Sequence, residues 1–356
     1  MKRLILALAL AAAPAALAHE GHSHSDRPSR ATTEAVVLGQ GQHQYKTIPG
    51  WAKVLKGEHF GPTHGSAAVD KDGNIYITLN SANQDGFGIL VYDKEGNVKK
   101  GIAKGEHGLH SLIYVEEGDE GFLYGALNGQ KGEKMGAVKL TLDGEVVMRL
   151  GKPEESPAGG FNPTGVAVGP DGDIYLADGY ASNFIYQFDK KGKYIRHFGG
   201  RSDRKTNRFE EGKFQTCHGI NVDYRGEEPT LLIADRENGR LQSFTLEGEF
   251  IAVTTTELRR PCAVVFHGDL AAVAELAGRA VVLDKDNKVV SVLGDNPNQG
   301  QRANYRVAPK DWTEGFFNAP HGLTFDNDGN LIITEWNANG RFAFLQKIEA
   351  KADTSE

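Results

Sequence analysis

Four histidines, one cysteine and one threonine stand at equivalent places in six copies of a short sequence pattern. They are His64, His110, Thr164, His218, Cys262 and His321. Four of the six are histidines, and imidazole nitrogens are common protein ligands of zinc. A single histidine at such a place is more often structural, but titratable rings that recur at one repeat position are not what an apolar core requires. The recurrence therefore favours a shared metal site.

Each copy consists of a short apolar segment, a turn rich in Asp, Gly and Asn, and a second apolar segment. The clearest copies are residues 64–78, 164–178 and 321–335. Turn residues between short apolar segments predict antiparallel hairpins. Further apolar segments, such as residues 184–189 and 191–195, supply a third and a fourth strand for each copy.

The spacing of the copies predicts the fold. Their first residues lie 44 to 59 positions apart, and four short antiparallel strands that recur at about 50 residues are typical of a β-propeller blade. We therefore expect an all-β protein, a six-bladed β-propeller of four-stranded antiparallel blades, in one domain over residues 42–348. Residues 45–54 are expected to pair with the last blade, which closes the ring and removes a free sheet edge.

In such a ring the first residue of every innermost strand lies near one mouth of the central channel. His110, His218 and His321 belong to the second, fourth and sixth copies, so they are expected at intervals of about 120° around the axis of a six-bladed ring. Three converging imidazoles with an open fourth position are the arrangement of a catalytic zinc site. His64, in the first copy, faces the same cavity.

Three strings resemble the lyase domain of the peptidylglycine α-amidating enzymes: Ala177–Asn183, Ala234–Phe244 and Pro320–Gly322. The resemblance extends from about residue 60 to 345, and the Asp-Arg-Glu-Asn-Gly-Arg string within it is specific, whereas the blade frame alone resembles many propellers of the NHL type. It implies a six-bladed propeller with zinc on three channel histidines.

By motif match, these zinc ligands are His110, His218 and His321, and the catalytic residues are Tyr180 and Arg236. The family reaction removes glyoxylate from a peptidyl-α-hydroxyglycine and leaves a peptide amide. Zinc can polarise the substrate, and Tyr180 could act as a base if Arg236 and the metal stabilise its phenolate. Arg236 could instead orient the substrate carboxylate through a bidentate pair.

The chain also departs from the family. It has no arginine between Arg30 and Arg149, where the family has one in its first blade; His64 is expected to take the place of that arginine, or to act as a fourth metal ligand. Gly322 follows His321 where the family has an acidic residue associated with calcium, so calcium is not expected. The chain shows no copper monooxygenase domain, so a separate monooxygenase would supply the substrate.

Three function classes remain open. The first is a zinc lyase for an α-hydroxyglycine-like compound, and the second is a propeller hydrolase or lyase for another small α-hydroxy compound or a lactone. The third is a metal-binding or protein-binding propeller without turnover. Only the first two classes need Tyr180 and Arg236. Otherwise Tyr180 could be a packing residue, and Arg236 could form an ion pair with Asp235 or Glu237. Arg240, at the start of a strand, is interpreted as structural.

The remaining features concern location and partners. Residues 1–18 have the charged, apolar and small-residue regions of a signal peptide, so we expect an exported monomer, periplasmic or secreted, with no membrane contact after cleavage. Residues 19–41 are expected to be a disordered His-rich leader, although its histidines could bind a metal, and 349–356 a polar tail. A net charge of −7 without a basic stripe excludes nucleic acid and leaves a small-molecule or peptide substrate.

Cys217 and Cys262 are the two cysteines of the chain. An oxidising compartment permits a disulfide between them, since both are expected on innermost strands of neighbouring blades. The alternative is that Cys262 is a free thiol on the channel ring.

Overall fold

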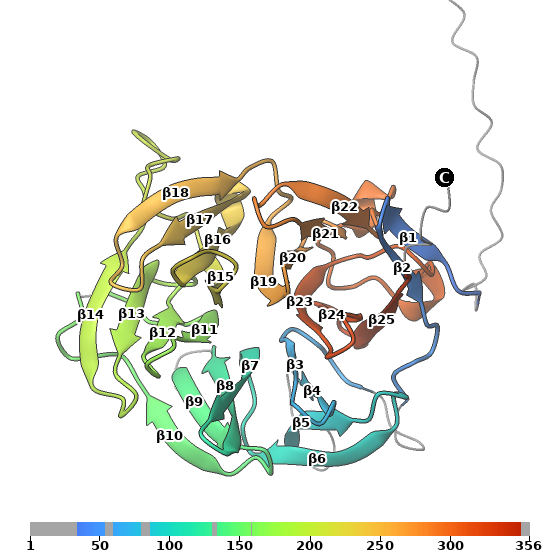
Figure 1. The fold of residues 1–356 in the computed structure, drawn as a ribbon, viewed down its shortest axis with the longest axis horizontal. Helices are drawn as coiled ribbons and strands as arrows, with labels where there is room; N and C mark the ends of the chain where they lie inside the picture. Colours follow the sequence, from blue (N-terminus) through green and yellow to red (C-terminus); the bar gives the residue numbers. More distant parts are fainter. Residues whose placement is uncertain (1–33, 54–59, 80–85, 130–133, 158, 350–356) are drawn as a thin grey trace, which may run out of the picture.

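The computed structural model describes residues 34–53, 60–79, 86–129, 134–157 and 159–349. Within these residues, six antiparallel sheets stand around a common axis (Figure 1). Five of the sheets have four strands, and the sixth has five. The predicted fold class, an all-β propeller of six four-stranded antiparallel blades, is confirmed.

The strands follow the chain blade by blade. The first two blades contain β3 (Ala67–Val69), β4 (Ile75–Thr78), β5 (Phe87–Tyr92) and β6 (Val98–Lys104), then β7 (Leu109–Glu117), β8 (Glu120–Leu127), β9 (Gly136–Thr141) and β10 (Val146–Leu150). The next two contain β11 (Gly165–Val168), β12 (Ile174–Ala177), β13 (Phe184–Phe188) and β14 (Tyr194–Gly199), then β15 (Cys217–Asp223), β16 (Thr230–Asp235), β17 (Arg240–Phe244) and β18 (Phe250–Thr255).

The fifth blade contains β19 (Pro261–His267), β20 (Leu270–Glu275), β21 (Arg279–Leu283) and β22 (Val289–Leu293). The sixth contains β23 (Pro320–Phe325), β24 (Leu331–Glu335), β25 (Arg341–Lys347), β2 (His43–Thr47) and β1 (Val37–Gln40). Three short 3₁₀ helices, η1 (Arg236–Asn238), η2 (Gln299–Gln301) and η3 (Pro309–Asp311), lie in the connections. Among the described residues, no helix is long and apolar enough to span a membrane.

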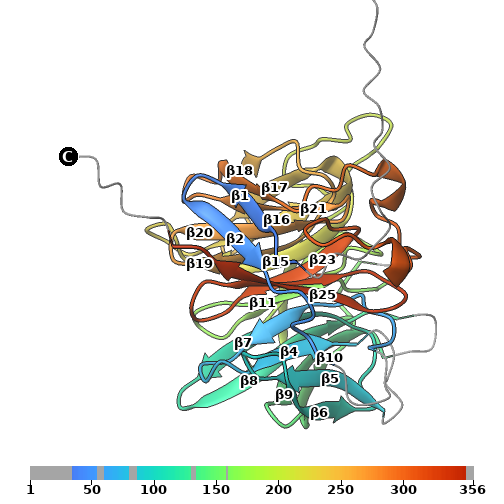
Figure 2. The same ribbon diagram turned by 90° about the vertical axis from the view of Figure 1, so that its right-hand side faces the viewer.

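The ring is closed by strands from both ends of the chain. Strand β2 pairs with β25, with Tyr45 opposite Lys347, and Figure 2 shows the blue β1–β2 hairpin against the red last blade. The predicted pairing of the N-terminal segment with the last blade is confirmed, although the strand ends at Thr47.

Strand β1 corrects the expectation that residues 19–41 form a disordered leader. Leu38 on this strand is buried in an apolar cluster with Leu293 and Phe317, so the last part of the leader is held by burial and by the pairing of β1 with β2. The predicted signal peptide, the His-rich start of the leader and residues 350–356 of the tail lie outside the described residues.

The Asp-rich turns form because a single carboxylate satisfies several turn donors. Asp326 accepts hydrogen bonds from the backbone N–H of Asp328 at 3.0 Å and of Asn330 at 2.8 Å. Asp70 makes the same contacts with Asp72 at 3.0 Å and Asn74 at 2.8 Å. These turns fix the angle between the first two strands of a blade, and with it the direction of the innermost strand.

Candidate metal centre at the propeller axis

Four of the six ring residues lie on β-bulges at the start of innermost strands. They are His110 in β7, His218 in β15, Cys262 in β19 and His321 in β23, and in each case the pairing register with the next strand shifts across the residue. A bulge redirects a side chain out of the regular alternation of a strand. This local irregularity allows the four side chains to face the axis instead of a neighbouring blade.

Glycines next to the ring residues allow the innermost strands to approach one another. A Cβ atom on Gly219, after His218, would lie 2.5 Å from the carbonyl oxygen of Cys262. A Cβ atom on Gly322, after His321, would lie 2.6 Å from the carbonyl oxygen of Gly65. Since real side chains do not tolerate such distances, the His-Gly pairs in the sequence are a condition for a narrow axis.

The four histidines form one cluster. The ring centroid of His64 lies 4.6 Å from that of His110 and 4.5 Å from that of His321. The centroid of His218 lies 4.8 Å from each of the same two rings. The structure therefore brings all the histidines predicted at the ring together, with His64 half-buried and the other three buried.

Backbone carbonyl oxygens fix two of the imidazoles. Nδ1 of His110 lies 2.6 Å from the carbonyl oxygen of Thr164, and Nδ1 of His218 lies 2.7 Å from that of Cys262. A carbonyl oxygen only accepts, so each Nδ1 carries the hydrogen and each Nε2 presents a lone pair. The Nε2 atoms both lie 3.1 Å from the hydroxyl oxygen of Tyr180. Such an outer contact on Nδ1 is typical of metal-binding histidines.

His321 has no such partner. Its side chain is 3% exposed, and neither Nδ1 nor Nε2 makes a hydrogen bond to any described residue. A buried polar group without a partner is costly. A metal ion is a group that would satisfy it, and the residues around it are suitable ligands.

Two sets of three side chains converge closely enough to hold an ion. One is His64, His110 and His321, and the other is His218, Cys262 and His321; within each set the ligand atoms lie within 4.8 Å of one another. The predicted trio of His110, His218 and His321 is thus divided between two sets that share His321. The donor types, neutral nitrogen and thiolate sulfur, suit zinc and similar transition metals.

Burial keeps these imidazoles neutral. Desolvation lowers the pKa of His110, His218 and His321 well below the usual value, and the charges of neighbouring histidines and of Arg236 lower it further. A metal needs the neutral form of its histidine ligands. The cluster is therefore in the binding-competent protonation state at neutral pH.

Tyr180 and Arg236 lie over the cluster, as the resemblance implied. Tyr180 is in the turn after β12, where its backbone N–H donates to the carbonyl oxygen of Asn162 at 3.2 Å. Arg236 begins η1 and donates from Nη1 to the Tyr180 hydroxyl at 3.3 Å. Burial raises the pKa of Tyr180, and the Arg236 guanidinium offsets part of this effect. In the metal-free protein Tyr180 is accordingly a phenol.

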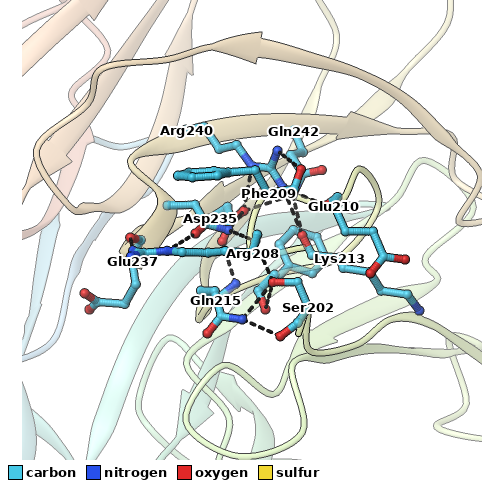
Figure 3. A network of polar contacts seen from close by, with 12 residues as sticks. Ser202, Arg208, Phe209, Glu210, Lys213, Gln215, Asp235, Glu237, Arg240 and Gln242 are labelled. Atoms are coloured by element: carbon cyan, nitrogen blue, oxygen red, sulfur yellow. Dashed lines mark hydrogen bonds and ion pairs between the residues drawn. The ribbon is translucent and has the colours of Figure 1, made fainter. Parts of the chain in front are cut away.

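A closed polar network holds the turn that carries Arg236 (Figure 3). The buried carboxylate of Asp235 accepts from Arg240 Nε at 2.7 Å, from the Gln215 backbone N–H at 2.8 Å and from Asn238 Nδ2 at 2.8 Å. Arg240 also donates to the carbonyl oxygens of Phe209 and Glu210. The structural interpretation of Arg240 is confirmed, and Asp235 pairs with Arg240 instead of Arg236.

Of the ion-pair partners considered for Arg236, the structure shows Glu237, which pairs with Arg236 at 3.0 Å and with Arg260 at 2.7 Å, so one carboxylate connects two arginines. Two residues around the site, Arg260 and Trp336, were not anticipated from the sequence. Trp336 lies beside His64, with ring centroids 6.0 Å apart. Trp336 follows Glu335 as Arg236 follows Asp235, and aligning these strand ends could have found it. Arg260 had no comparable signal, because it lies in a connection outside the repeat.

Both cysteines are free and buried. The structure does not contain the disulfide that the sequence left open. The alternative, a free Cys262 thiol on the ring, agrees with the structure. Burial raises the pKa of Cys262 to about 11, and the Arg236 and Arg260 guanidinium groups oppose that rise.

Comparison with curated proteins finds distant relatives. The chain is 28% identical over 191 residues to peptidyl-glycine alpha-amidating monooxygenase B of Xenopus laevis, a match that covers 51% of this chain and 20% of that protein. It is 32% identical over 104 residues to a probable peptidyl-alpha-hydroxyglycine alpha-amidating lyase of Caenorhabditis elegans, and 28% of each chain is covered. With peptidyl-alpha-hydroxyglycine alpha-amidating lyase 1 of Drosophila melanogaster it shares 26% identity over 225 residues, 59% of this chain and 40% of that one.

Solved structures support the fold. A streptogramin B lyase superposes with a TM-score of 0.53 at 15% identity, over 82% of this chain and 95% of that one. No family model matches the chain. The sequence relatives nevertheless show distant homology to the amidating-lyase region, which confirms the resemblance. The matched segments make up well under two thirds of each curated relative named above.

Proposed function

From this distant homology, we propose that the chain is a zinc-dependent lyase that cleaves an α-hydroxyglycine-like substrate into an amide and glyoxylate. The observation that carries the proposal is the arrangement at the axis. His321, buried without a hydrogen bond to any described residue, lies in a cluster of imidazoles. A tyrosine hydroxyl that accepts from an arginine lies against two of these imidazoles.

The ion would be held at the axial cluster by His110, His218 and His321. When bound there, zinc would act as a Lewis acid toward the substrate oxygen atoms and favour an ionised α-hydroxyl. The neutral Nε2 atoms of His110 and His218 are already directed to one point by the carbonyl contacts of their Nδ1 atoms.

Tyr180 is suited to move the proton that the reaction requires. Cleavage of an N-acyl-α-hydroxyglycine breaks the bond between the amide nitrogen and the α-carbon, turns the α-hydroxyl into the aldehyde of glyoxylate and leaves the hydroxyl proton on the amide nitrogen. No other reactant is consumed. With its phenolate stabilised by Arg236, which donates to the Tyr180 oxygen, and by the bound metal, Tyr180 could take this proton from the hydroxyl and return it to the departing nitrogen.

The arginines provide charge for the carboxylate of the substrate. Arg236 and Arg260 share one oxygen of Glu237, and the Arg260 side chain is 41% exposed. A carboxylate entering the mouth could replace Glu237 on these donors. His64, in the place of the family's first-blade arginine, would contact the same substrate from the opposite side or serve as a further metal ligand.

The proposed setting follows from the sequence features described above. We propose that the chain is exported and acts as a monomer, on an α-hydroxyglycine made by a separate monooxygenase. Calcium has no role in the proposal.

The test is glyoxylate release from a simple N-acyl-α-hydroxyglycine by the purified mature protein. Zinc-loaded protein should release glyoxylate, and the same protein after chelation should not. The His321→Ala variant is the matched control, because it removes one ligand and leaves Tyr180 and Arg236 in place. Zinc-loaded wild-type protein that binds metal but releases no glyoxylate would overturn the lyase assignment.

A further inference from the structure

Cys262 occupies the ring with the same local backbone as a histidine. Like His218, it is the second residue of an innermost strand and lies on a β-bulge. Two positions before each of them stands a non-glycine residue with positive φ, Thr216 at 77° before His218 and Arg260 at 60° before Cys262. Such conformations are strained, and they persist where the surrounding structure imposes them. The fifth blade therefore presents a sulfur to the axis in the way that the fourth presents a nitrogen.

The surroundings of Sγ do not account for this placement. Cys262 is 2% exposed, and its polar contacts are a long one of 3.7 Å from Sγ to the carbonyl oxygen of Arg260 and one with the Arg236 side chain, which can stabilise a thiolate. The neighbours in its buried cluster, Leu276 and Ala319, are apolar and do not require a sulfur. Sγ instead lies within 4.8 Å of ligand nitrogens of His218 and His321.

His321 provides an independent indication of a ligand at the same point. Both of its ring nitrogens are buried and lack a hydrogen bond to any described residue, and it belongs to the set that contains Cys262. His218 is already oriented, since its Nδ1 is bound to the carbonyl oxygen of Cys262 itself. The backbone of Cys262 thus positions one neighbouring ligand while its side chain points into the same space.

We propose that Cys262 is a further metal ligand, and that its thiolate binds the axial ion in addition to the proposed histidines, on the side of His218 and His321. This inference rests on the metal-binding half of the proposed function and does not depend on the lyase reaction. On binding, the Sγ–H bond breaks, its proton goes to solvent and a sulfur–metal bond forms, without any redox change. The positively charged Arg236 lies beside Sγ and favours the ionised sulfur.

A thiolate changes which ions the site selects. An all-imidazole set accepts zinc, copper, iron and nickel, whereas a sulfur ligand shifts preference toward zinc and other thiophilic ions. The thiolate also brings a negative charge that imidazoles lack, so the bound ion withdraws less electron density from a substrate than it would among three imidazoles. Cys262 would therefore influence both metal identity and the strength of the Lewis acid.

Cobalt(II) is the probe for the first experiment. Metal-free mature protein titrated with cobalt(II) should develop a near-ultraviolet thiolate-to-cobalt charge-transfer band together with visible ligand-field bands. Cys262→Ala should lose the charge-transfer band and weaken cobalt binding by more than the roughly 10–100-fold caused by loss of an outer-shell contact. Cys217→Ala, which removes the other buried cysteine outside both ligand sets, should keep the band and the affinity.

A wild-type measurement covers the case in which Cys262→Ala does not fold. The ¹¹³Cd resonance of cadmium-loaded wild-type protein should appear in the region of mixed sulfur and nitrogen ligation. Cobalt or cadmium bound with spectra of nitrogen and oxygen ligands alone, or a charge-transfer band that survives in Cys262→Ala, would overturn the assignment of Cys262 and leave the proposed metal site intact. Absence of any metal binding would overturn both.

Discussion

The carboxylate of Asp235 and the imidazole of His321 are both buried polar groups at the ends of inner blade strands, but they differ in their partners. Asp235 accepts hydrogen bonds from a guanidinium, a backbone N–H and two side-chain amides. His321 accepts and donates none within the described residues. Asp235 is thus satisfied by protein groups alone, whereas the imidazole of His321 lies among other possible metal ligands, which makes a metal ion its natural partner.

Buried carboxylates in two other blades are also hydrogen-bonded, unlike the imidazole of His321 within the described residues. In the fifth blade the buried Glu275 is paired with Arg279 and accepts from the backbone N–H of Arg259. In the third blade the buried Asp178 accepts from the backbone N–H groups of Asn162 and Ser182. These carboxylates stabilise the turns that surround the mouth, and the imidazoles inside the mouth are held by those turns. The carboxylates therefore stabilise the structure, and the imidazoles are available for metal binding.

The largest expected effect comes from removing the fully hydrogen-bonded carboxylate of Asp235. Asp235→Ala leaves the buried Arg240 guanidinium without its carboxylate, and removal of one partner of a buried pair typically costs about 3–5 kcal/mol. Urea unfolding should show a loss of this size. The matched control Asp286→Ala removes an exposed pair with Lys285 and should leave the free energy of unfolding nearly unchanged, because water screens an exposed pair. An equal loss of unfolding free energy in both variants would contradict the structural role assigned to Asp235.

At the axial site, Tyr180→Phe removes one hydroxyl group and no metal ligand. If Tyr180 transfers the proton, glyoxylate release should fall by about 100-fold to 10,000-fold while zinc content and thermal stability stay near wild type. Tyr186→Phe, in the same blade with its hydroxyl 3.4 Å from Ser182 Oγ, is the control and should retain activity. Wild-type turnover in Tyr180→Phe would remove Tyr180 from the mechanism.

Loss of His321 should separate metal binding from folding. His321→Ala removes the nitrogen atoms that both ligand sets share, so zinc affinity should fall by more than the roughly 10–100-fold caused by loss of an outer-shell contact. The metal-free variant should lose less stability than Asp235→Ala, because no hydrogen bond is broken. Elemental analysis and urea unfolding on the same sample measure both. Full zinc occupancy in His321→Ala would show that the ion is bound elsewhere.

A further effect is a dependence of stability on pH in the metal-free protein. Burial holds the pKa of His110, His218 and His321 below the usual value, so the unfolded chain takes up protons first as the pH falls. Their contribution is fully present above the unfolded value of about 6.5 and is lost below it, with a slope of about 1.4 kcal/mol per pH unit for each histidine. His321→Ala should reduce this slope in urea unfolding. An unchanged slope would contradict a lowered pKa of His321 in the folded protein.

The sequence predicted the propeller because each blade repeats a hairpin whose turn residues and apolar segments are local signals. It predicted the axial positions of His110, His218 and His321 for the same reason, since the innermost strand of every blade starts at the same place in the repeat. The role of Tyr180 followed from the resemblance instead, and its contact with two imidazoles was visible only in three dimensions.

Other features of the site could not be predicted from local patterns. The bulges at the ring residues depend on pairing with the next strand, and no residue type marks them. Arg260 joins the site through Glu237 of the preceding blade, a contact between segments that the repeat does not relate. The order of residues 37–41 depends on burial of Leu38 by blades from the other end of the chain.

The shared last blade has a consequence for the time course of folding. Tyr45 and Lys347 pair across the closing seam although nearly the whole chain separates them, and contacts of such long sequence separation form late and slowly. A ribosome must complete β25 before the hairpin of β1 and β2 has a partner, so the first strands synthesised are among the last to be paired. Until then their unpaired edges can associate with other chains, so association between chains would compete with closure of the ring.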